Sequence, residues 1–448
     1  MIIWYLFLLL SIWCLGFILA RLLLNKPHFL EWIGISFILG SFVIGLIWYI
    51  LNWYADVPIN RELGNWTIAI CFALLAIFRK ETLYHFIRLM QDRISKIRFR
   101  SISFIGISII ILYSMTTFLP NAIIPVTDWD ALTLYDFRAL IVNKTGFFSS
   151  PAIVSNYFLG YPPFTSIGHL FGYIFDFYGV KMFYSALILS LSLTFYGLCR
   201  KYSSSLSSIL ATALVITHPL VVSQTYFAYT NLPYMIYYGL ASIYLIQWTQ
   251  SRSHKDMLVA GILFAGSSWI RAAEPLYILA ILNALVFLFL FKRFKNWHHL
   301  LLLLTPFFFR EWWFYHINNT REAFNIHSPV SSELLSSQTD MLDHGIRVIN
   351  FVFKYAISDF IWLLILAAFA AFFALKQKNL LAIASSVFVS SIVAVLFYGT
   401  YVFSKSFEAW ENIPDSLTRL SMILLIPACF LVSSLIFKST DKKHLRRE

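Results

Sequence analysis

Long apolar runs recur along the whole chain, and this feature most constrains its fold. The chain opens with "MIIWYLFLLLSIWCLGFILARLLLNK", and a second apolar run follows almost at once. A removable signal peptide has one short apolar core behind a basic start, so these two runs are interpreted as membrane spans. A composition with 59% hydrophobic and 12% charged residues also excludes a water-soluble protein of this size. The sequence therefore predicts an all-α, polytopic transmembrane helical bundle.

The apolar runs predict about thirteen spans. A helix of ~20 residues crosses a bilayer squarely, and several of the runs are shorter, so these are expected to extend into adjacent polar residues. The expected spans are residues 2–20, 28–52, 66–78, 102–119, 181–199, 205–222, 231–248, 257–270, 275–291, 298–309, 350–375, 379–400 and 416–437.

Basic residues gather between alternate spans. One face of the predicted topology receives 23 of the 34 Lys and Arg residues, and the positive-inside rule makes that face cytoplasmic. The segment "RKETLYHFIRLMQDRISKIRFR" (79–100) supplies seven of them and is predicted to be an amphipathic helix on the anionic inner leaflet. Topology thus explains the net charge of +12, so we expect membrane lipids as partners and no nucleic acid.

This topology organises the chain into two regions. Residues 1–101 hold the N-terminal spans and the basic cytoplasmic segment, and residues 102–448 hold the remaining spans. Within the second region the outer loops are expected at 120–180, 310–349 and 401–415. In the first loop, "YPPFTSIGHLFGYIFDFYG" is predicted to form a helix lying in or dipping into the outer interface. The expected location is a bacterial inner (cytoplasmic) membrane, with the ER membrane as the eukaryotic equivalent.

Cysteine and histidine usage gives no sign of a metal site or a disulfide framework. The cysteines all lie in apolar segments and are expected to be small buried hydrophobes. The outer histidines show no metal-ligand spacing and are expected to be hydrogen-bonded structural residues. No P-loop, dinucleotide fingerprint or GxSxG elbow occurs, so energy from a nucleotide is not expected. The residues concerned are Cys14, Cys71, Cys199 and Cys429, and His169, His218, His316, His327 and His344.

Acids and an arginine gather in "PVTDWDALTLYDFRAL" (125–140), directly after an apolar run. Asp128 and Asp130 are two positions apart and cannot share one helical face. Asp128 is expected to cap the helix that follows, and Asp130 to lie in its first turn. The alternative interpretation is that both are solvated loop acids at the end of an interfacial helix, with no chemistry.

Three further arginines mark the outer ends of apolar runs: Arg271 in "SSWIRAAEPLYIL", Arg310 after "TPFFF", and Arg419 at the start of the last span. Each alone is explained as an anchor at the membrane boundary. The planar donors of arginine match phosphate oxygens, however. An acid that takes a proton, near arginines that hold a phosphate, is what transfer from a phosphate leaving group needs.

Short motifs from about residue 102 onward resemble the GT-C class of polytopic, lipid-dependent glycosyltransferases. That class includes the protein mannosyltransferases and the lipid A aminoarabinose transferases. "DWDALTLYDFRAL" is similar to the WDxLxYHxPR pattern, with Asp130 on the acid, Tyr135 on the tyrosine and Arg138 on the arginine. Asp136 stands where the pattern has His.

Five later segments extend this resemblance. "LGYPPFTSIGHLFGYIFDFYG" is similar to the YPPL helix, and "FAYTNLPYMIYYGL" to the YADLPL segment, with Asn in place of the acid. "WIRAAEPLYIL" resembles the (T)KxEG hairpin, with Pro275 in place of Gly. "TPFFFREWWFY" resembles the PWxxRN element, and "DSLTRLSMILLIP" the SLxRLLxxxxP ending. The candidate residues in these segments are Tyr161, Asn231, Arg271, Glu274, Arg310 and Arg419.

The resemblance implies transfer of a sugar from a polyprenyl-phosphate carrier to an acceptor lipid, glycan or protein on the outer face, with inversion. Asp130 is then the general base, with Asp128 as the second candidate acid. The resemblance assigns the departing phosphate to Arg138, Arg271, Arg310 and Arg419, and substrate positioning to Tyr135, Tyr161, Asn231 and Glu274. Some members of the class use a divalent metal and others do not, so the resemblance leaves a metal cofactor open. Residues 1–80 precede the region of resemblance.

Two other classes of function compete with this interpretation. A carrier or flippase for a lipid-linked or amphipathic substrate is expected to have broken helices and polar residues at mid-membrane. Here the strong charges lie at span ends and in outer loops, and no inverted halves stand out. A non-catalytic membrane scaffold has no need for a cluster of acids and arginines. The sequence therefore favours an enzyme acting on a lipid head group.

Overall fold

The computed structural model describes residues 1–94, 102–150, 161–290, 294–323, 341–406 and 410–436, and within these ranges it contains helices and no strand. The chain forms two compact units, Met1–Pro233 with Ile436–Glu448, and Tyr234–Leu435. The all-α prediction is thus confirmed for the described residues. The boundary expected after residue 101 lies inside the first unit.

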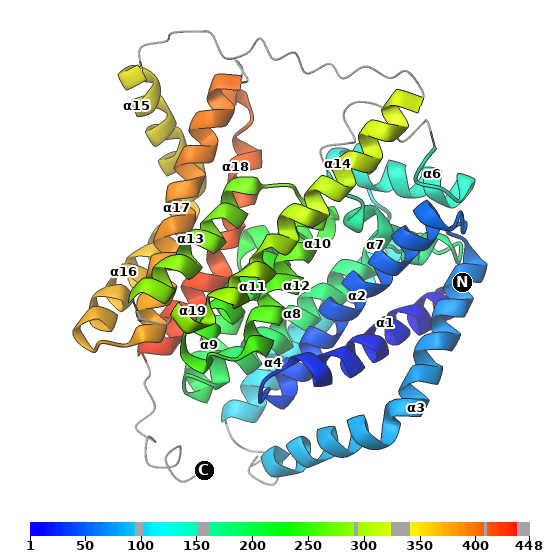
Figure 1. Cartoon of the computed structure of the whole chain (residues 1–448), viewed down its shortest axis with the longest axis horizontal. Coiled ribbons are helices and arrows are strands. Elements are labelled where there is room, and N and C mark those ends of the chain that lie inside the picture. The colour runs from blue at the N-terminus through cyan, green and yellow to red at the C-terminus, as the bar shows by residue number, and fades with distance from the viewer. Residues whose placement is uncertain (95–101, 151–160, 291–293, 324–340, 407–409, 437–448) are drawn as a thin grey trace. The chain divides into compact units, whose positions relative to one another are not determined.

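The first unit carries the N-terminal helices and the segment with the candidate acids (Figure 1). Its elements are α1 (Ile2–Leu23), α2 (Phe29–Tyr54), α3 (Arg61–Ile94), α4 (Ile102–Thr116), α5 (Phe118–Ile123), the π-helix η1 (Ala131–Asp136), α6 (Phe137–Thr145), α7 (Phe164–Tyr173), α8 (Met182–Arg200), α9 (Ser205–Ile216), α10 (Pro219–Phe227) and the start of α11 (Asn231–Ser251).

Helix α2 lies at the centre of this unit, packed between α1 and α8. Glycines allow the close approach, because a Cβ atom added at Gly16 would lie 1.7 Å from the carbonyl oxygen of Ser36, and one at Gly40 would lie 2.0 Å from that of Ile12. On the other side, a Cβ at Gly197 of α8 would lie 2.5 Å from the backbone nitrogen of Glu31. Small residues at such crossings let membrane helices pack backbone to backbone.

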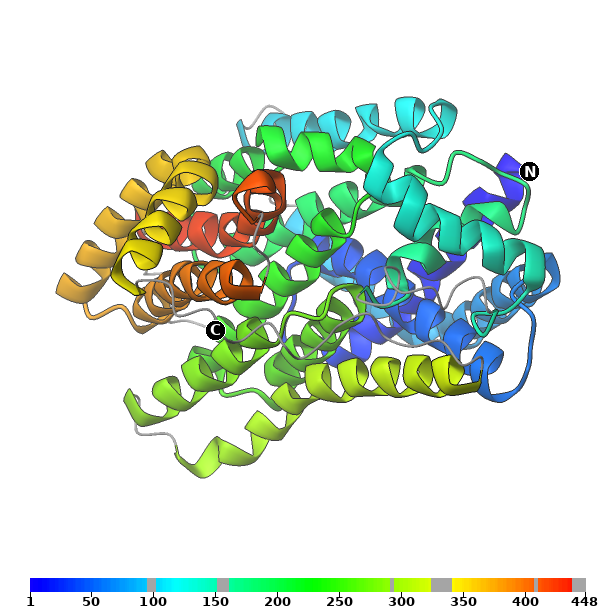
Figure 2. The ribbon, with the colours of Figure 1, turned by 90° about the horizontal axis from the view of Figure 1, so that it is seen from above.

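Helices α6 and α7 pack against each other, and α7 also contacts α1, α2 and η1. Both lie on the side of the first unit where the N-terminus is found (Figure 2). The sequence predicted a helix here at the outer interface. The helix is confirmed, and all ten residues of α7 are buried, so it packs in the core of the unit.

Helix α3 continues beyond its apolar half through most of the segment predicted to be amphipathic. Its Phe86 ring packs 5.1 Å from Phe17 of α1 and 5.9 Å from Trp32 of α2. Residues 95–100 of that prediction lie outside the described residues.

The second unit begins within α11 and is helical in its described part. Its elements are α12 (His254–Ile270), α13 (Glu274–Leu290), η4 (Phe294–Leu304), α14 (Thr305–Ala323), α15 (Met341–Val352), η6 (Phe353–Ile357), η7 (Ser358–Phe360), α16 (Ile361–Lys376), α17 (Leu380–Ser406), η8 (Trp410–Asn412), α18 (Pro414–Ser421), η9 (Met422–Leu424) and α19 (Leu425–Ile436).

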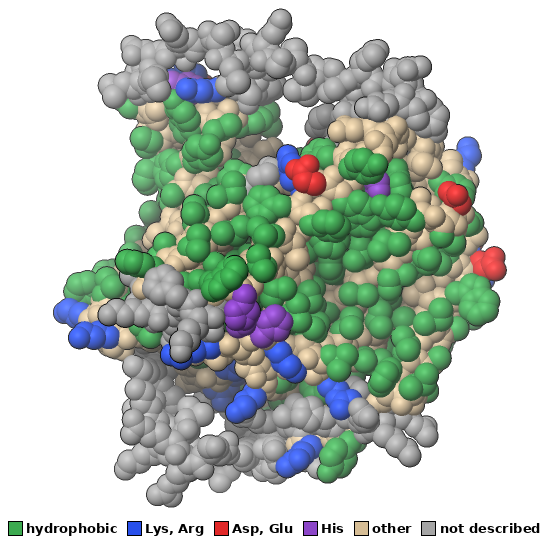
Figure 3. All heavy atoms as spheres, viewed as in Figure 1, with side chains coloured by type: hydrophobic (Ala, Val, Ile, Leu, Met, Phe, Trp, Pro, Cys, Tyr) green, Lys and Arg blue, Asp and Glu red, His purple; other side chains and the backbone are tan. Residues whose placement is uncertain are grey.

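Eight helices of the described chain are long and apolar enough to cross a membrane, or nine if α9 and α10, bent by 52°, form one span. This supports a multi-pass membrane protein, while the predicted count of about thirteen spans is not confirmed. Large apolar side chains face outward, for example Leu112 at 68% and Trp362 at 78% exposure. Figure 3 shows hydrophobic side chains spread over the middle of the visible face. All four cysteines are free and buried, as predicted.

Candidate functional site

The segment with the candidate acids forms a short helical turn followed by a π-helix. The carbonyl of Asp128 accepts a hydrogen bond from the N–H of Leu132 (2.9 Å), so Asp128 occupies the N-cap position that the sequence predicts. Asp130 lies in the first turn and directly precedes the π-helix η1. Single turns of π-helix are rare and are found frequently at functional sites.

Asp128 is half-buried and interacts with a lysine that the sequence analysis did not select. Burial raises the pKa of the Asp128 carboxyl, and the positive charge of Lys181 opposes that shift. Lys181 is 3% exposed, and burial lowers its pKa while Asp128 opposes the shift. Its only signal in the sequence is a single basic residue in front of the apolar run of α8, on the predicted outer side. Asp130 is also half-buried.

Arg138 is almost completely buried, at 1% exposure, on α6. Its Nη1 donates a hydrogen bond to the carbonyl oxygen of Tyr161 (2.8 Å). Burial lowers the pKa of the guanidinium to about 10, and the nearby hydroxyls of Tyr135 and Tyr49 oppose the shift. A group with that pKa keeps its positive charge at neutral pH. Arg138 is therefore a fixed, desolvated cation, and an anion placed against it would be held strongly.

Tyr135 and Tyr161, both selected from the sequence, meet beside this arginine. Their rings pack edge to face with centroids 5.5 Å apart, and the Tyr135 hydroxyl lies 3.1 Å from the Thr230 hydroxyl. The next residue, Asn231, donates from Nδ2 to Oε1 of Gln224 (3.2 Å). Tyr161 and Thr230, which are distant from η1 in the sequence, thus both contact Tyr135.

Asp136, the last residue of η1, belongs to a hydrogen-bonded group of four side chains. His169 Nδ1 is 2.8 Å from Oδ1 of Asp136, and the Tyr173 hydroxyl donates to the same oxygen (2.5 Å). On the other side of the ring, Nε2 is 3.0 Å from the hydroxyl of Tyr184. Burial and the neighbouring Asp136 raise the pKa of the Tyr173 hydroxyl above its ordinary value. The prediction that His169 is a hydrogen-bonded structural histidine is confirmed, whereas its pairing with Asp136 was not foreseen.

The other predicted arginines belong to the second unit, where each is half-buried. Arg271 ends α12, and its carbonyl accepts a hydrogen bond from the Tyr277 hydroxyl (3.0 Å). Arg310 pairs with Glu311, and its guanidinium carbon lies 4.8 Å from the centre of the Phe314 ring.

Arg419 donates from Nε to the carbonyl of Asp415 (3.1 Å) on α18. Glu274 begins α13, and its side chain is outside the described part of the structure.

Two of the other predicted histidines form side-chain hydrogen bonds, as the sequence predicts. His218 caps α10 by accepting the Leu220 N–H, and His344 lies 2.8 Å from the Ser404 hydroxyl. His316 is buried, with its ring against Trp312, and His327 lies outside the described residues. The described residues contain no group of three or more His, Cys, Asp or Glu side chains arranged to hold a metal ion.

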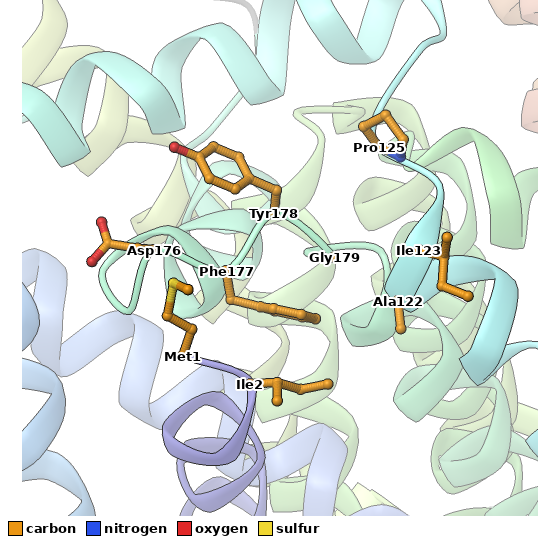
Figure 4. Close-up of a pocket in the computed structure, with 9 residues that line it drawn as sticks. All are labelled: Met1, Ile2, Ala122, Ile123, Pro125, Asp176, Phe177, Tyr178 and Gly179. Carbon is orange, nitrogen blue, oxygen red and sulfur yellow. The ribbon is translucent and has the colours of Figure 1, made fainter.

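A pocket of about 410 Å³ opens near the candidate acids (Figure 4). Pro125 and Gly179 line it, three residues before Asp128 and two before Lys181. Met1 and Ile2 of α1 and Phe177 give it largely apolar walls. The start of an apolar helix therefore lies beside the segment that carries the acids.

Comparison with known proteins adds no further information: no family model, curated protein or solved structure matches this chain.

Proposed function

We propose that this chain is a membrane glycosyltransferase that moves a sugar from a polyprenyl-phosphate carrier to a hydroxyl of an acceptor lipid, glycan or protein. The chain is proposed to cross a bacterial inner membrane about thirteen times and to carry its site on the outer face of that membrane. One observation carries the proposal: Asp128, Asp130 and the buried cation Arg138 lie within eleven consecutive residues where apolar helices end. This is the pairing of acid and phosphate-binding cation that the chemistry needs.

In the proposed reaction Asp130 takes the proton of the acceptor hydroxyl. The acceptor oxygen forms a bond to the anomeric carbon of the sugar while the bond from that carbon to the lipid phosphate breaks. The electron pair of the broken bond leaves with the phosphate, and attack from the opposite side inverts the anomeric centre. Asp128 is the second candidate base, because burial already raises its pKa toward the working range of a general base.

Arg138 is proposed to hold the departing phosphate, since a buried guanidinium stabilises developing negative charge more strongly than one in water. Arg271, Arg310 and Arg419 are proposed as further phosphate contacts. Tyr135, Tyr161, Asn231 and Glu274 are proposed to position the substrates. The resemblance leaves a divalent metal cofactor open, and each role proposed here belongs to the chain's own residues.

One observation favours a carrier or flippase as the second candidate. Helices α9 and α10 are joined by a bend of 52°, and broken helices are common around the substrate sites of carriers. The bend lies between Thr217, which ends α9, and Pro219, which begins α10. Pro219 has no backbone N–H, so it cannot continue the helical hydrogen bonding of α9. Proline chemistry alone thus accounts for the bend.

The test uses the full chain in lipid nanodiscs with undecaprenyl-phosphate carrying a radiolabelled sugar. Membrane extract supplies the acceptor, and the readouts are labelled product and released undecaprenyl phosphate. Several donor sugars are assayed in parallel because the sugar is not identified. The expected result is turnover of at least one donor that falls by at least about 100-fold in Asp130→Asn and in Arg138→Gln.

Matched variants separate chemistry from charge removal. Asp56→Asn removes an exposed acid and Arg61→Gln an exposed arginine from the same unit, and both are expected to keep full turnover. Full turnover in Asp130→Asn would reject this residue as the base. Movement of the labelled lipid across proteoliposomes without any glycosyl product would reject the enzyme and support the carrier.

A further inference from the structure

Asp136, His169, Tyr173 and Tyr184 form a closed hydrogen-bonded group that the proposed reaction does not use. The side chains of His169 and Asp136 are 0% and 4% exposed, and they come from α7 and from the last position of η1. The group therefore joins the π-helix to two other helices in the interior of the first unit.

The hydrogen bonds fix how many protons this group holds. The Tyr184 hydroxyl has one hydrogen, which it donates to the carbonyl of Ala228 (2.7 Å). The Tyr184 hydroxyl must therefore accept a hydrogen bond at its contact with His169, so Nε2 of His169 carries a hydrogen. One further proton lies between Nδ1 and the Asp136 carboxyl. With the proton on nitrogen the two form an ion pair, and with the proton on oxygen both are neutral, so in either case the pair has no net charge.

Because the pair has no net charge, its burial costs less desolvation free energy than the burial of a single charged side chain. A lone carboxylate or imidazolium would be expensive there, because neither would have water to solvate it. Tyr173 supplies a second donor to Oδ1 of Asp136, which helps to satisfy that oxygen. The orientation of Asp136 is thus specified from two sides.

The pair of Asp136 and His169, called the anchor below, lies between the two parts of the proposed site. Asp136 ends η1, which follows Asp130, and it stands two residues before Arg138. The neighbouring Tyr135 ties the same turn to Thr230. A single π-helical turn is a rare backbone conformation, and these side-chain hydrogen bonds help to hold it in place.

We propose that Asp136 and His169 are positioning residues, which share one proton and hold η1 and α6 so that Asp130 and Arg138 face a bound phosphate. The part concerning phosphate rests on the proposed function, whereas the anchoring of η1 does not. Partners that orient the ligands of a metal site typically contribute about 10- to 100-fold to affinity or activity, and we expect an effect of that order here.

The first experiment measures the anchor without any ligand. Hydrogen–deuterium exchange of the full chain in nanodiscs is followed for peptides covering residues 131–138, with a peptide from α2 as reference. Asp136→Ala is expected to speed exchange in 131–138 and to leave α2 unchanged. Asp136→Asn is expected to stay close to the wild type, because its amide N–H donates to Nδ1 of the neutral His169 ring. Equal exchange in wild type and Asp136→Ala would overturn the anchor, and so would equally faster exchange in every peptide.

Ring nitrogen NMR of histidine-labelled protein, with His169 assigned by its loss in His169→Gln, tests the proton count. The expected spectrum has a protonated Nε2 in the wild type and in Asp136→Asn. A bare Nε2 would overturn the shared-proton assignment.

The second experiment measures binding of farnesyl phosphate by calorimetry. Asp136→Ala and His169→Ala are expected to weaken binding by about 10-fold or more, Asp136→Asn by less, and the exposed control Asp56→Asn not at all. If Arg138→Gln loses binding while Asp136→Ala keeps it, the positioning role fails and the phosphate contact stands. If the wild type does not bind the probe, or Arg138→Gln binds it equally well, the phosphate site of the proposed function fails, while the exchange and NMR results still decide the anchor.

Discussion

The ammonium of Lys201 lies 2.7 Å from a carboxylate oxygen of Glu31, a residue 170 positions earlier in the chain. The side chain of Glu31 is fully buried, and it also accepts the backbone N–H of His28 in the capping box of α2. The ion pair therefore joins the first turn of α2 to the residue that ends α8. It lies beside Gly197, one of the positions where the backbones of α2 and α8 approach closely.

Lys201→Met is expected to lower stability by roughly 3 kcal/mol, because it leaves the buried Glu31 carboxylate without its counter-charge. The double variant Glu31→Gln/Lys201→Met is expected to recover part of the loss, since it removes the stranded charge. The measurement is the midpoint of thermal unfolding in detergent, with the exposed Lys144→Met as control. A Lys201→Met protein as stable as that control would show that the pair does not contribute to stability.

Gly16→Ala and Gly40→Ala are each expected to destabilise the first unit by about 1–3 kcal/mol. The added methyl groups would lie 1.7 Å and 2.0 Å from backbone oxygens of the facing helix, so α1 and α2 would have to separate. Gly399→Ala is the matched control, because nothing lies within 4 Å of its added methyl group. Equal unfolding midpoints for the three variants would contradict the observed α1–α2 packing.

The all-α class and the first helices were predictable from the sequence because long apolar runs predict membrane helices. The runs at 2–20 and 28–52 correspond to α1 and α2 within a few residues. The run at 66–78 marks only the apolar part of α3, because a helix continues wherever its backbone hydrogen bonds do, whatever the polarity of its side chains.

The candidate site was predictable only where its residues are close in the chain. Tyr135 and Arg138 were found through one local motif, and the structure brings both to Tyr161. The pairing of Asp136 with His169 spans 33 positions, and no periodicity links residues that far apart. Lys181 was missed for the same reason, because its partner Asp128 is 53 positions away in the sequence.

Asp128→Asn is expected to flatten the pH dependence of stability. Burial raises the pKa of Asp128 in the folded chain, so the fold favours the protonated carboxyl. The corresponding stabilisation is fully present below the ordinary Asp pKa of about 3.9 and is lost as pH rises through the folded value. Unfolding midpoints measured from about pH 4 upward should therefore fall in the wild type relative to Asp128→Asn.

Lys181→Met should enlarge that effect, because the positive charge of Lys181 opposes the rise in the pKa of Asp128. Carboxyl carbon NMR of aspartate-labelled protein measures the titration directly, with Asp128→Asn identifying the signal. An unchanged Asp128 titration in Lys181→Met would show that the two charges are not coupled.

The two candidate bases can be separated by comparing Asp128→Asn with Asp130→Asn in the donor turnover assay. If Asp130 removes the acceptor proton, Asp130→Asn should lower turnover at saturating donor by about 10²–10⁴-fold. Asp128→Asn should then change it by less than about 10-fold, since only a neighbouring charge is lost. The reverse order would assign the base to Asp128, whose pKa is raised by burial, and the acidic limb of the pH–rate profile would then lie above the ordinary range of an aspartate. Equal and complete turnover in both variants would remove this turn from the chemistry altogether.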